Sequence, residues 1–463
     1  MRKEKIILAL IVLGGLVLRL INLNQSFWLD EAAQVIESSR SFLSQFHIPS
    51  DFHPPLYHVL LHFWMYFGNS EVWVRLLPVL LGTGSIILLY RVGTNLGNRK
   101  EGLIASLFLA LSPYHIWYSQ EARPYILFVF LSLLTTYLLL KKKWVMYFLA
   151  TTLSLYSFYF AQFFILGQLI WIFFFARKDF GKYSKSLFLA ILLFIPWLPS
   201  FWQQIGRGTS GVFAGWTNVV SVPGLKAIPL TIAKFIFGKG SIDNLFLYSL
   251  IVLPVFLVFV ISLLEVYKKK EGKIILSLFF IPLTTAVFVS FFIPIAAPQR
   301  FIFLLPLFLI ILAKGIGRFP KFGKWAAVLI ICFTSMMGII QYYTDPYVQR
   351  EQWREAVDYV EKQPSEQSIA LLVFPAPFAP YLWYSKNVIE AVGIAPKFNL
   401  RDEDLSNLAV KLINKKTVYL FQYLTGLTDP QDKTKAFLEN NGFTERIIKD
   451  FPGVGFIYVY DRK

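Results

Sequence analysis

The feature that most constrains the fold is a series of apolar runs, each about as long as a membrane-spanning helix and separated by short basic loops. A spanning helix needs ~20 mostly apolar residues. With 56% hydrophobic residues and a mean hydropathy of +0.55, the chain has more apolar surface than one soluble domain can bury. We therefore predict a mainly α polytopic membrane protein with about eleven spans. The predicted spans are roughly 5–22, 71–91, 101–118, 124–140, 143–158, 161–176, 186–203, 245–266, 273–293, 299–313 and 325–343.

The positive charge of the chain follows the membrane part. Residues 1–343 contain 30 Lys+Arg and 12 Asp+Glu, whereas residues 344–463 contain 15 and 16. The excess gathers in short loops, as orientation signals do, and forms no stripe suited to a duplex, so we predict no nucleic-acid partner. The positive-inside rule places these loops in the cytoplasm, and an odd number of spans then puts the C-terminal part outside. The basic loops are 91–100, 141–143, 176–185, 267–273 and 313–324.

Two further features bear on this topology. The N-terminal MRKEK and the apolar run behind it resemble a signal peptide, but no small-residue cleavage site follows before Arg19, so we interpret the run as an uncleaved first span. Residues 143–177 are basic at both ends and about twice as long as one short span, so we predict a hairpin turning near Tyr159. Cys332, the single cysteine, excludes an intrachain disulfide.

Three outer segments, 23–70, 204–244 and 344–463, are long enough to hold chemistry. In the first, apolar residues from Leu29 to Phe46 have helical spacing with a polar opposite face, which predicts a helix along the membrane surface. Residues 53–67 are too short to cross. We therefore expect outer juxtamembrane helices at about 28–67 and a transmembrane catalytic domain at 1–343.

The last segment predicts a small extracytoplasmic α/β domain at 344–463. Helical patterns alternate there with β-rich apolar runs. We expect helices at 351–362, 403–414 and 431–440, and strands at 368–374, 417–424 and 454–460.

A charged acid near lipid has a high free-energy cost, so each acid of the outer loops is a candidate for a functional role. The topology places seven there: Asp30, Glu31, Glu37, Asp51, Glu71, Glu121 and Asp243. The adjacent pair Asp30-Glu31 and Glu121 are the strongest catalytic candidates. Two alternatives stay open: Asp30-Glu31 favourably placed at a helix N-terminus, or Glu121 paired with Arg123 in the interface.

All five histidines also map to the outer side or its border. His58 and His62 have i,i+4 spacing on one helix face and could ligate a metal if an acid joined them. Interfacial packing is the favoured interpretation, because no HExxH motif and no cysteine ligand accompany them. We predict no metal site from the residues.

Three segments in fixed order resemble a known family. They are WLDEAAQVIESSRSF, then HPPLYHVLLHFWMYFGNSEVWVRLLPVLLGTGSIILLYRVGTNL, then SPYHIWYSQEARPY. Together they resemble the N-terminal signature of the protein O-mannosyltransferase-like glycosyltransferases, and they are similar to the aminoarabinose transferase of lipid A. The resemblance is strong over about residues 1–130 and includes APQRF at 297–301. The segment YYTDPYVQREQWREAVDYV resembles prokaryotic members with an extracytoplasmic domain.

The resemblance implies a GT-C fold, a polyprenyl-phosphate-linked sugar donor and transfer with inversion at the anomeric carbon. Asp30 matches the family aspartate proposed as the base, and Glu31 matches its neighbour. Glu121 stands where many members have Asp, which leaves its role open between acceptor binding and a second acidic contact. Within the same motifs we expect Tyr57, Tyr118 and Tyr125 to bind substrate.

The residues themselves fit this chemistry. A hydroxyl acceptor needs a carboxylate to take its proton during attack. The departing lipid phosphate needs positive charge rather than a second, protonated carboxyl. We expect Arg123, Arg300 and His53 to bind the donor phosphate.

The sequence hypothesis is therefore a glycosyltransferase on the outer face of a prokaryotic cytoplasmic membrane. Its partners are the bilayer, a polyprenyl-phosphate sugar and a hydroxyl on a protein, lipid or glycan; a divalent cation is left open. A multi-span transporter or flippase is the alternative, which would favour repeated halves and interrupted helices at matching positions. A scaffold without enzyme activity would have no buried acid cluster.

Overall fold

The computed structural model describes residues 2–48, 51–209, 224–362, 366–395 and 400–462. The predicted outer segment 204–244 therefore lies partly outside the described residues. The chain divides into two compact units. The first comprises residues 1–23, 41–205 and 218–344, and the second comprises residues 24–40, 206–217 and 345–463.

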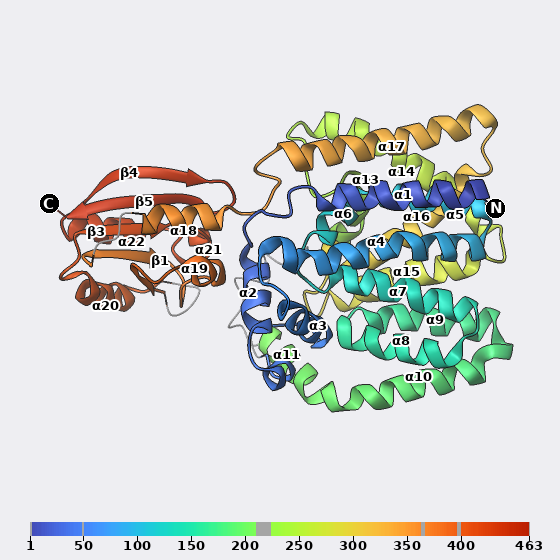
Figure 1. Ribbon diagram of the computed structural model, residues 1–463, viewed down its shortest axis with the longest axis horizontal. Helices are drawn as coiled ribbons and strands as arrows, with labels where there is room; N and C mark the ends of the chain where they lie inside the picture. The colour runs from blue at the N-terminus through green and yellow to red at the C-terminus, as the bar shows by residue number, and fades with distance from the viewer. Residues whose placement is uncertain (1, 49–50, 210–223, 363–365, 396–399, 463) are drawn as a thin grey trace. The chain divides into compact units, whose positions relative to one another are not determined.

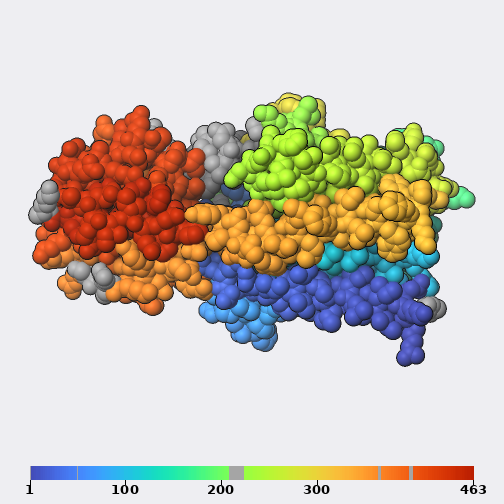
Figure 2. Space-filling model, turned by 90° about the horizontal axis from the view of Figure 1, so that it is seen from above, coloured from blue at the N-terminus to red at the C-terminus, as the bar shows by residue number. Residues whose placement is uncertain are grey.

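The first unit is a bundle of helices that run side by side (Figure 1). Among the described residues, six helical stretches are long and apolar enough to cross a membrane: 71–96, 177–207, 245–267, 272–289, 298–316 and 321–344. Figure 2 shows one side of this bundle, on which α17 (orange) lies beside α1 (blue). The helices are α1 (Arg2–Leu20), α3 (Leu56–Met65), α4 (Glu71–Leu96), α5 (Arg99–Ala110), α6 (Pro113–Ser119), α7 (Tyr125–Leu140), α8 (Trp144–Ser157), α9 (Ala161–Phe175), α10 (Phe180–Phe194), α11 (Leu198–Thr209), α13 (Ala227–Phe237), α14 (Leu245–Tyr267), α15 (Gly272–Val289), α16 (Leu305–Ile316) and α17 (Lys321–Thr344). Short 3₁₀ turns lie at Phe42–Phe46, Arg177–Asp179, Ile195–Trp197, Gly224–Lys226 and Pro298–Leu304.

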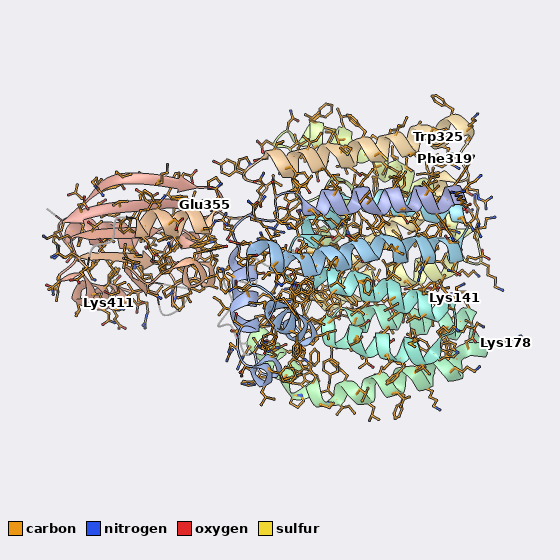
Figure 3. The ribbon with its side chains drawn as sticks, viewed as in Figure 1. Lys141, Lys178, Phe319, Trp325, Glu355 and Lys411 are labelled. Atoms are coloured by element: carbon orange, nitrogen blue, oxygen red, sulfur yellow. The ribbon has the colours of Figure 1, made fainter. Side chains whose placement is uncertain are left out.

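The basic loops lie at one end of this bundle. Figure 3 shows Lys141 and Lys178 at the same end as Phe319 and Trp325. Ion pairs join the loops to one another: Arg99 with Glu4 at 3.0 Å, Lys142 with Asp179 at 2.7 Å and Lys314 with Glu101 at 3.4 Å. A cavity of about 380 Å³ at this end is lined by residues of 95–101, 265–271 and 314–318.

Two predicted helices are interrupted. The expected span 101–118 is wrong, because α5 ends at Ala110 and α6 begins at Pro113, with the Ser112 hydroxyl accepting a hydrogen bond from the amide of His115. Proline is tolerated in a first helical turn but not in a helix interior. The hairpin of α8 and α9, in contrast, turns at residues 158–160 as predicted.

The surface helix predicted from Leu29 is shorter than expected. Helix α2 (Leu29–Ser38) stops before Arg40, and residues 42–46 form the 3₁₀ turn. The Ser39 hydroxyl donates to the carbonyl of Val35 at 2.7 Å, and such serine side chains compete with the helical ladder. Helix α2 is part of the second unit.

The second unit is built on a five-stranded sheet of order β2-β1-β3-β5-β4. Strand β1 pairs in parallel with β2 and β3, whereas β5 pairs antiparallel with β3 and β4. Apolar clusters around Trp353 on one face and Ile369 on the other form its core. Its strands are β1 (Ser368–Leu372), β2 (Glu390–Gly393), β3 (Thr417–Phe421), β4 (Phe443–Phe451) and β5 (Gly455–Arg462). Its other helices are α18 (Trp353–Glu361), α19 (Ala379–Tyr384), α20 (Asp402–Leu412), α21 (Thr425–Thr428) and α22 (Lys433–Asn440).

Candidate active site

A buried polar cluster in the first unit centres on Asp51. One carboxylate oxygen lies 2.7 Å from Nδ1 of His53, and the other lies 2.6 Å from Nε2 of His58. The Arg123 guanidinium lies 3.6 Å from Asp51 and 3.1 Å from the same His53 nitrogen. The side chains of Asp51 and Arg123 are only 10% and 9% exposed. A loop, the first turn of α3 and the segment before α7 thus converge on one carboxylate.

The electrostatics of this cluster fix two charge states. Burial opposes ionisation of Asp51, but the charges of His53 and Arg123 and the hydrogen bonds from His53 and His58 outweigh it, so its pKa lies well below the usual range. Burial lowers the pKa of His53, and the nearby charges of Arg123 and Arg300 lower it further against the attraction of Asp51. These shifts favour the ionised form of Asp51 and oppose protonation of His53.

The structure brings together the three residues predicted to bind the donor phosphate. His53 contacts Arg123 directly. Arg300 is near enough for its charge to act on His53, and its own guanidinium donates to the carbonyl of Ile295 at 2.9 Å. These side chains come from segments far apart in the sequence, and each precedes a helix of the bundle.

Aromatic rings enclose one side of His53. The Phe158 ring stacks on the imidazole with centroids 5.5 Å apart, and the Tyr125 ring meets it edge-on at 6.1 Å. Tyr118 packs against Tyr125 at 5.2 Å. Two of the three tyrosines predicted to bind substrate therefore adjoin the cluster. Tyr57, the third, is fully buried in α3.

Helix α6 leads into Glu121, and the helix is held in place by a buried arginine of α1. Arg19 is fully buried and donates to the carbonyls of Leu109 and Ala110 at the end of α5. Its guanidinium also reaches Nδ1 of His115 at 2.8 Å and the Ser119 hydroxyl at 3.2 Å. These contacts satisfy carbonyls that a helix end leaves without partners.

Glu121 follows directly from this anchored segment. It is 1% exposed and accepts a hydrogen bond of 3.1 Å from the indole of Trp117. The guanidinium of Arg123 contacts Asp51 and His53. The backbone amide of Arg123 donates to the carbonyl of Glu121 at 2.8 Å, which links the two residues directly.

Asp30 and Glu31 lie in the first turn of α2, in the second unit. Glu31 is fully buried, whereas Asp30 is half-buried. Trp28, the residue before the helix, gives it no side-chain cap. In the described part of the chain, Asp30 forms no hydrogen bond or ion pair, and its charge acts on Glu351.

The two histidines considered as metal ligands have different partners. His58 contacts Asp51, whereas Nε2 of His62 lies 3.1 Å from the Tyr66 hydroxyl. Over the described ranges, no group of three or more His, Cys, Asp or Glu side chains is placed to hold a metal ion.

Sequence reasoning missed Asp51 and Glu351 as site residues. Asp51 was only one of seven outer acids, although its place two residues before His53 was a signal, since both residues directly precede Pro54-Pro55. Nothing in the local pattern marks Glu351, because its contacts with residues 26–29 span more than 300 positions.

Comparison with known proteins supports the sequence resemblance. Residues 52–200 match the family described as dolichyl-phosphate-mannose-protein mannosyltransferase. The fold is similar to that of ArnT from Cupriavidus metallidurans bound to undecaprenyl phosphate, with a TM-score of 0.61 at 10% identity, covering 98% of this chain and 97% of that one. The similarity to this family covers residues 52–200, and over the whole chain the comparison with ArnT shows a similar fold.

Two archaeal comparisons agree with this placement. The oligosaccharyltransferase of Archaeoglobus fulgidus, tethered to an acceptor peptide, gives a TM-score of 0.57 at 12% identity over 98% of this chain and 74% of that one. A dolichyl-phosphooligosaccharide-protein glycotransferase of the same organism is 36% identical over 94 residues, which is 19% of this chain. The match spans only 16% of the length of that relative.

Proposed function

We propose that this protein is an inverting GT-C glycosyltransferase that moves a sugar from a polyprenyl-phosphate donor to a hydroxyl acceptor on the outer face of a prokaryotic cytoplasmic membrane. The observation that carries the proposal is the contact of Arg123 with His53, with Arg300 close enough for its charge to act on the same imidazole. Two guanidinium groups beside an imidazole suit an anion with several oxygens, because Arg presents a planar fork to phosphate.

The reaction follows from charge and proton balance. The acceptor oxygen attacks the anomeric carbon on the face opposite the phosphate, and the bond from that carbon to the phosphate oxygen breaks. The electron pair of that bond goes to the lipid phosphate, where Arg123 and Arg300 stabilise the developing charge. The proton of the acceptor goes to Asp30, the general base. Glu31 orients Asp30, and Glu121 contacts the acceptor.

Asp51 has a supporting role in this proposal. It is the anion that holds Arg123 and His53 in one arrangement, since both contact the same carboxylate oxygen. A preorganised donor set costs no reorganisation when charge develops on the phosphate. Tyr118 and Tyr125 form an aromatic wall for the sugar, and Tyr57 is a third tyrosine proposed to bind substrate.

The solved relatives support the class of donor. The ArnT structure was described with undecaprenyl phosphate, and an archaeal oligosaccharyltransferase was described with dolichol phosphate and an inhibitory peptide. Both ligands join a polyprenyl tail to a phosphate. The same chemistry would suit the cluster around His53.

The test is a panel of radiolabelled polyprenyl-phosphate sugars, each incubated with the purified full chain and with peptide, lipid or glycan acceptors. We expect one donor to give labelled product, and Asp30→Asn to bind that donor without transferring its sugar. Translocation of a bound donor across vesicles without any product would instead identify a flippase. Chelator treatment of the active protein, followed by addition of a divalent cation, measures any metal requirement.

We also propose eleven spans with a catalytic part at 1–343 and an extracytoplasmic part at 344–463. The six long apolar helices and the clustered basic loops support this topology. In a Cys332→Ser background, cysteines at Ser44 and Glu403 should react with an impermeant reagent from outside. A cysteine at Lys142 should react only from the cytoplasmic side, and labelling of position 403 from that side would refute the topology.

A further inference from the structure

The segment that holds Asp30 is built into the C-terminal unit. Residues 24–40 cluster with residues 345–463 rather than with the helices on either side of them in the sequence. Phe27 is fully buried, and its ring packs against Trp383 and Tyr384 of α19. Its backbone amide donates to the Tyr384 hydroxyl at 2.7 Å. The approach to α2 is therefore fixed by residues from the far end of the chain.

The contacts converge on residues 350–353. The Ser26 hydroxyl donates to the carbonyl of Glu351 and accepts from the amide of Trp353. The Gln25 side chain accepts a hydrogen bond of 3.0 Å from the amide of Arg350. Two backbone segments are thereby joined directly before the first turn of α2.

The Glu351 carboxylate supplies the cap that α2 lacks locally. One oxygen accepts from the amide of Leu29 at 3.3 Å and from the Trp353 indole at 2.7 Å. The other accepts from the Tyr423 hydroxyl at 2.9 Å. An anion at a helix N-terminus satisfies amides that have no partner within the helix and interacts favourably with the helix dipole. Asp30 is the next residue after the capped amide.

We propose that Glu351 is a positioning residue that holds Asp30 in place for the transfer reaction, and that the C-terminal unit acts on catalysis through this single carboxylate. The inference rests on the proposed function, in which Asp30 is the base. It assigns to the extracytoplasmic unit a part in the reaction that does not depend on binding either substrate.

The same site makes the contact sensitive to pH. The pKa of Glu351 is raised to about 7. Burial raises it most and the charge of Asp30 also raises it, whereas the hydrogen bonds from Trp353, Tyr423 and Leu29 lower it. The groups that face the carboxylate are thus Leu29 and Asp30 of α2, Trp353 of α18 and Tyr423 after β3. Because the ionised form caps α2 best, the cap weakens as pH falls through this pKa.

The first experiment measures amide hydrogen exchange of residues 29–38 in the full chain. We expect Glu351→Ala to raise exchange about tenfold or more, because a hydrogen bond to a charged group is worth about 1.5–3 kcal/mol. The matched control is Asp404→Asn. Asp404 is also a buried carboxylate, and it accepts a hydrogen bond from the amide of Arg401, the residue directly before α20. Unchanged exchange in α2 for Glu351→Ala would overturn the proposal.

The second experiment measures transfer. Glu351→Gln should lower kcat about tenfold, leave KM for the donor unchanged and remove a rise of kcat between pH 6 and 8 that the unmutated protein shows. Adding Glu351→Gln to Asp30→Asn should lower the residual rate no further. If the two losses multiply, or if kcat is unchanged while exchange rises, Glu351 does not act through Asp30. If the unmutated chain transfers no sugar, the proposed function fails, and the exchange result still decides whether Glu351 holds α2.

Discussion

Two aspartates of the first outer segment stand in opposite surroundings. Asp51 contacts His53, His58 and Arg123, and those contacts hold its pKa well below the usual range. Asp30 forms no hydrogen bond or ion pair within the described residues, and its charge acts on another carboxyl, that of Glu351.

The different surroundings of Asp51 and Asp30 suit the two carboxylates to different roles. A carboxylate held by cations and N–H donors gives up its charge only at low pH, so it suits an orienting role. A carboxylate without such donors has lone pairs available for an incoming proton. Within the proposed reaction, this contrast favours Asp30 as the base and Asp51 as the residue that organises the phosphate site, so substitutions at the two sites should differ in kind.

The largest expected effect is that of Asp30→Asn. General-base catalysis contributes about 10²–10⁴-fold, so turnover should fall by that factor while donor affinity is retained. If Asp30 only stabilised the start of α2, Asn would serve nearly as well and activity would fall little. Steady-state transfer and donor titration measure the two quantities.

Glu31→Gln is the matched change at the neighbouring position. It should be milder if Glu31 only orients Asp30. A loss equal to that of Asp30→Asn would move the base assignment to Glu31. Near-normal transfer by Asp30→Asn would refute the assignment of Asp30 as the base.

Arg123→Ala should show the next largest effect, on donor affinity. Loss of a charge-assisted hydrogen bond to phosphate costs about 1.5–3 kcal/mol, which is a tenfold to roughly hundredfold weaker Kd. Arg123→Lys should recover only part of it, because a point charge lacks the guanidinium fork. Arg300→Ala should act in the same direction. Arg91→Ala is the control, since Arg91 lies over the Tyr137 ring at the end of the bundle with the basic loops.

Titration with polyprenyl phosphate alone separates binding from transfer. Acceptor affinity should change less than donor affinity in both Ala variants. Equal donor affinity in Arg123→Ala, Arg300→Ala and the unmutated chain would mean that the arginines are structural and that the phosphate binds elsewhere.

Asp51→Asn should raise KM for the donor about tenfold or less and leave most of kcat. The amide still accepts hydrogen bonds but no longer offsets the charge of Arg123, and breaking a buried ion pair costs about 3–5 kcal/mol. The folded-state pKa of Asp51 is depressed, so its stabilisation is present above the unfolded value of about 3.8 and is lost as pH falls below it. Thermal unfolding at pH 7 measures the cost. A fall in kcat as large as that of Asp30→Asn would contradict the assigned roles.

The sequence predicted the parts of this comparison that depend on local pattern. Apolar runs and basic loops predicted the helices of the bundle, because lipid leaves a helix no other way to satisfy its backbone. The motif around His53 and Arg123 predicted residues that the structure brings together. The strands β1, β3 and β5 were also expected, since their β-branched and aromatic runs are typical of buried strands.

What the sequence did not predict depends on distant contacts. Strand β4 was missed because its residues 444–450 are polar or exposed, so it has no apolar face to detect. The start of α2 has no local cap, and its cap comes from Glu351, which no spacing rule connects to Leu29. The position of Ser112 and Pro113 could have predicted the break between α5 and α6.

The smallest expected effect concerns Glu351, and it is a change with pH in the stability of the C-terminal unit. Its pKa is about 7 in the folded chain against an ordinary value of 4.5. The folded state therefore binds more protons than the unfolded state between these values, and stability falls as pH rises from about 5 to about 7. A shift of this size corresponds to about 1–3 kcal/mol, because one pKa unit is about 1.4 kcal/mol.

Glu351→Gln should remove this dependence, so the variant should be as stable as the unmutated chain at pH 5 and more stable at pH 8. Pulse proteolysis of residues 345–463 in the full chain, compared at each pH, measures the difference. Asp404→Asn is the control, because hydrogen bonds from Arg401 outweigh burial and lower the pKa of Asp404, which makes its contribution constant between pH 5 and 8. If the stability of Glu351→Gln and of the unmutated chain changes with pH in the same way, the Glu351 carboxyl is ionised throughout this range. The contrast between Asp30 and Asp51 would then rest on hydrogen bonding alone.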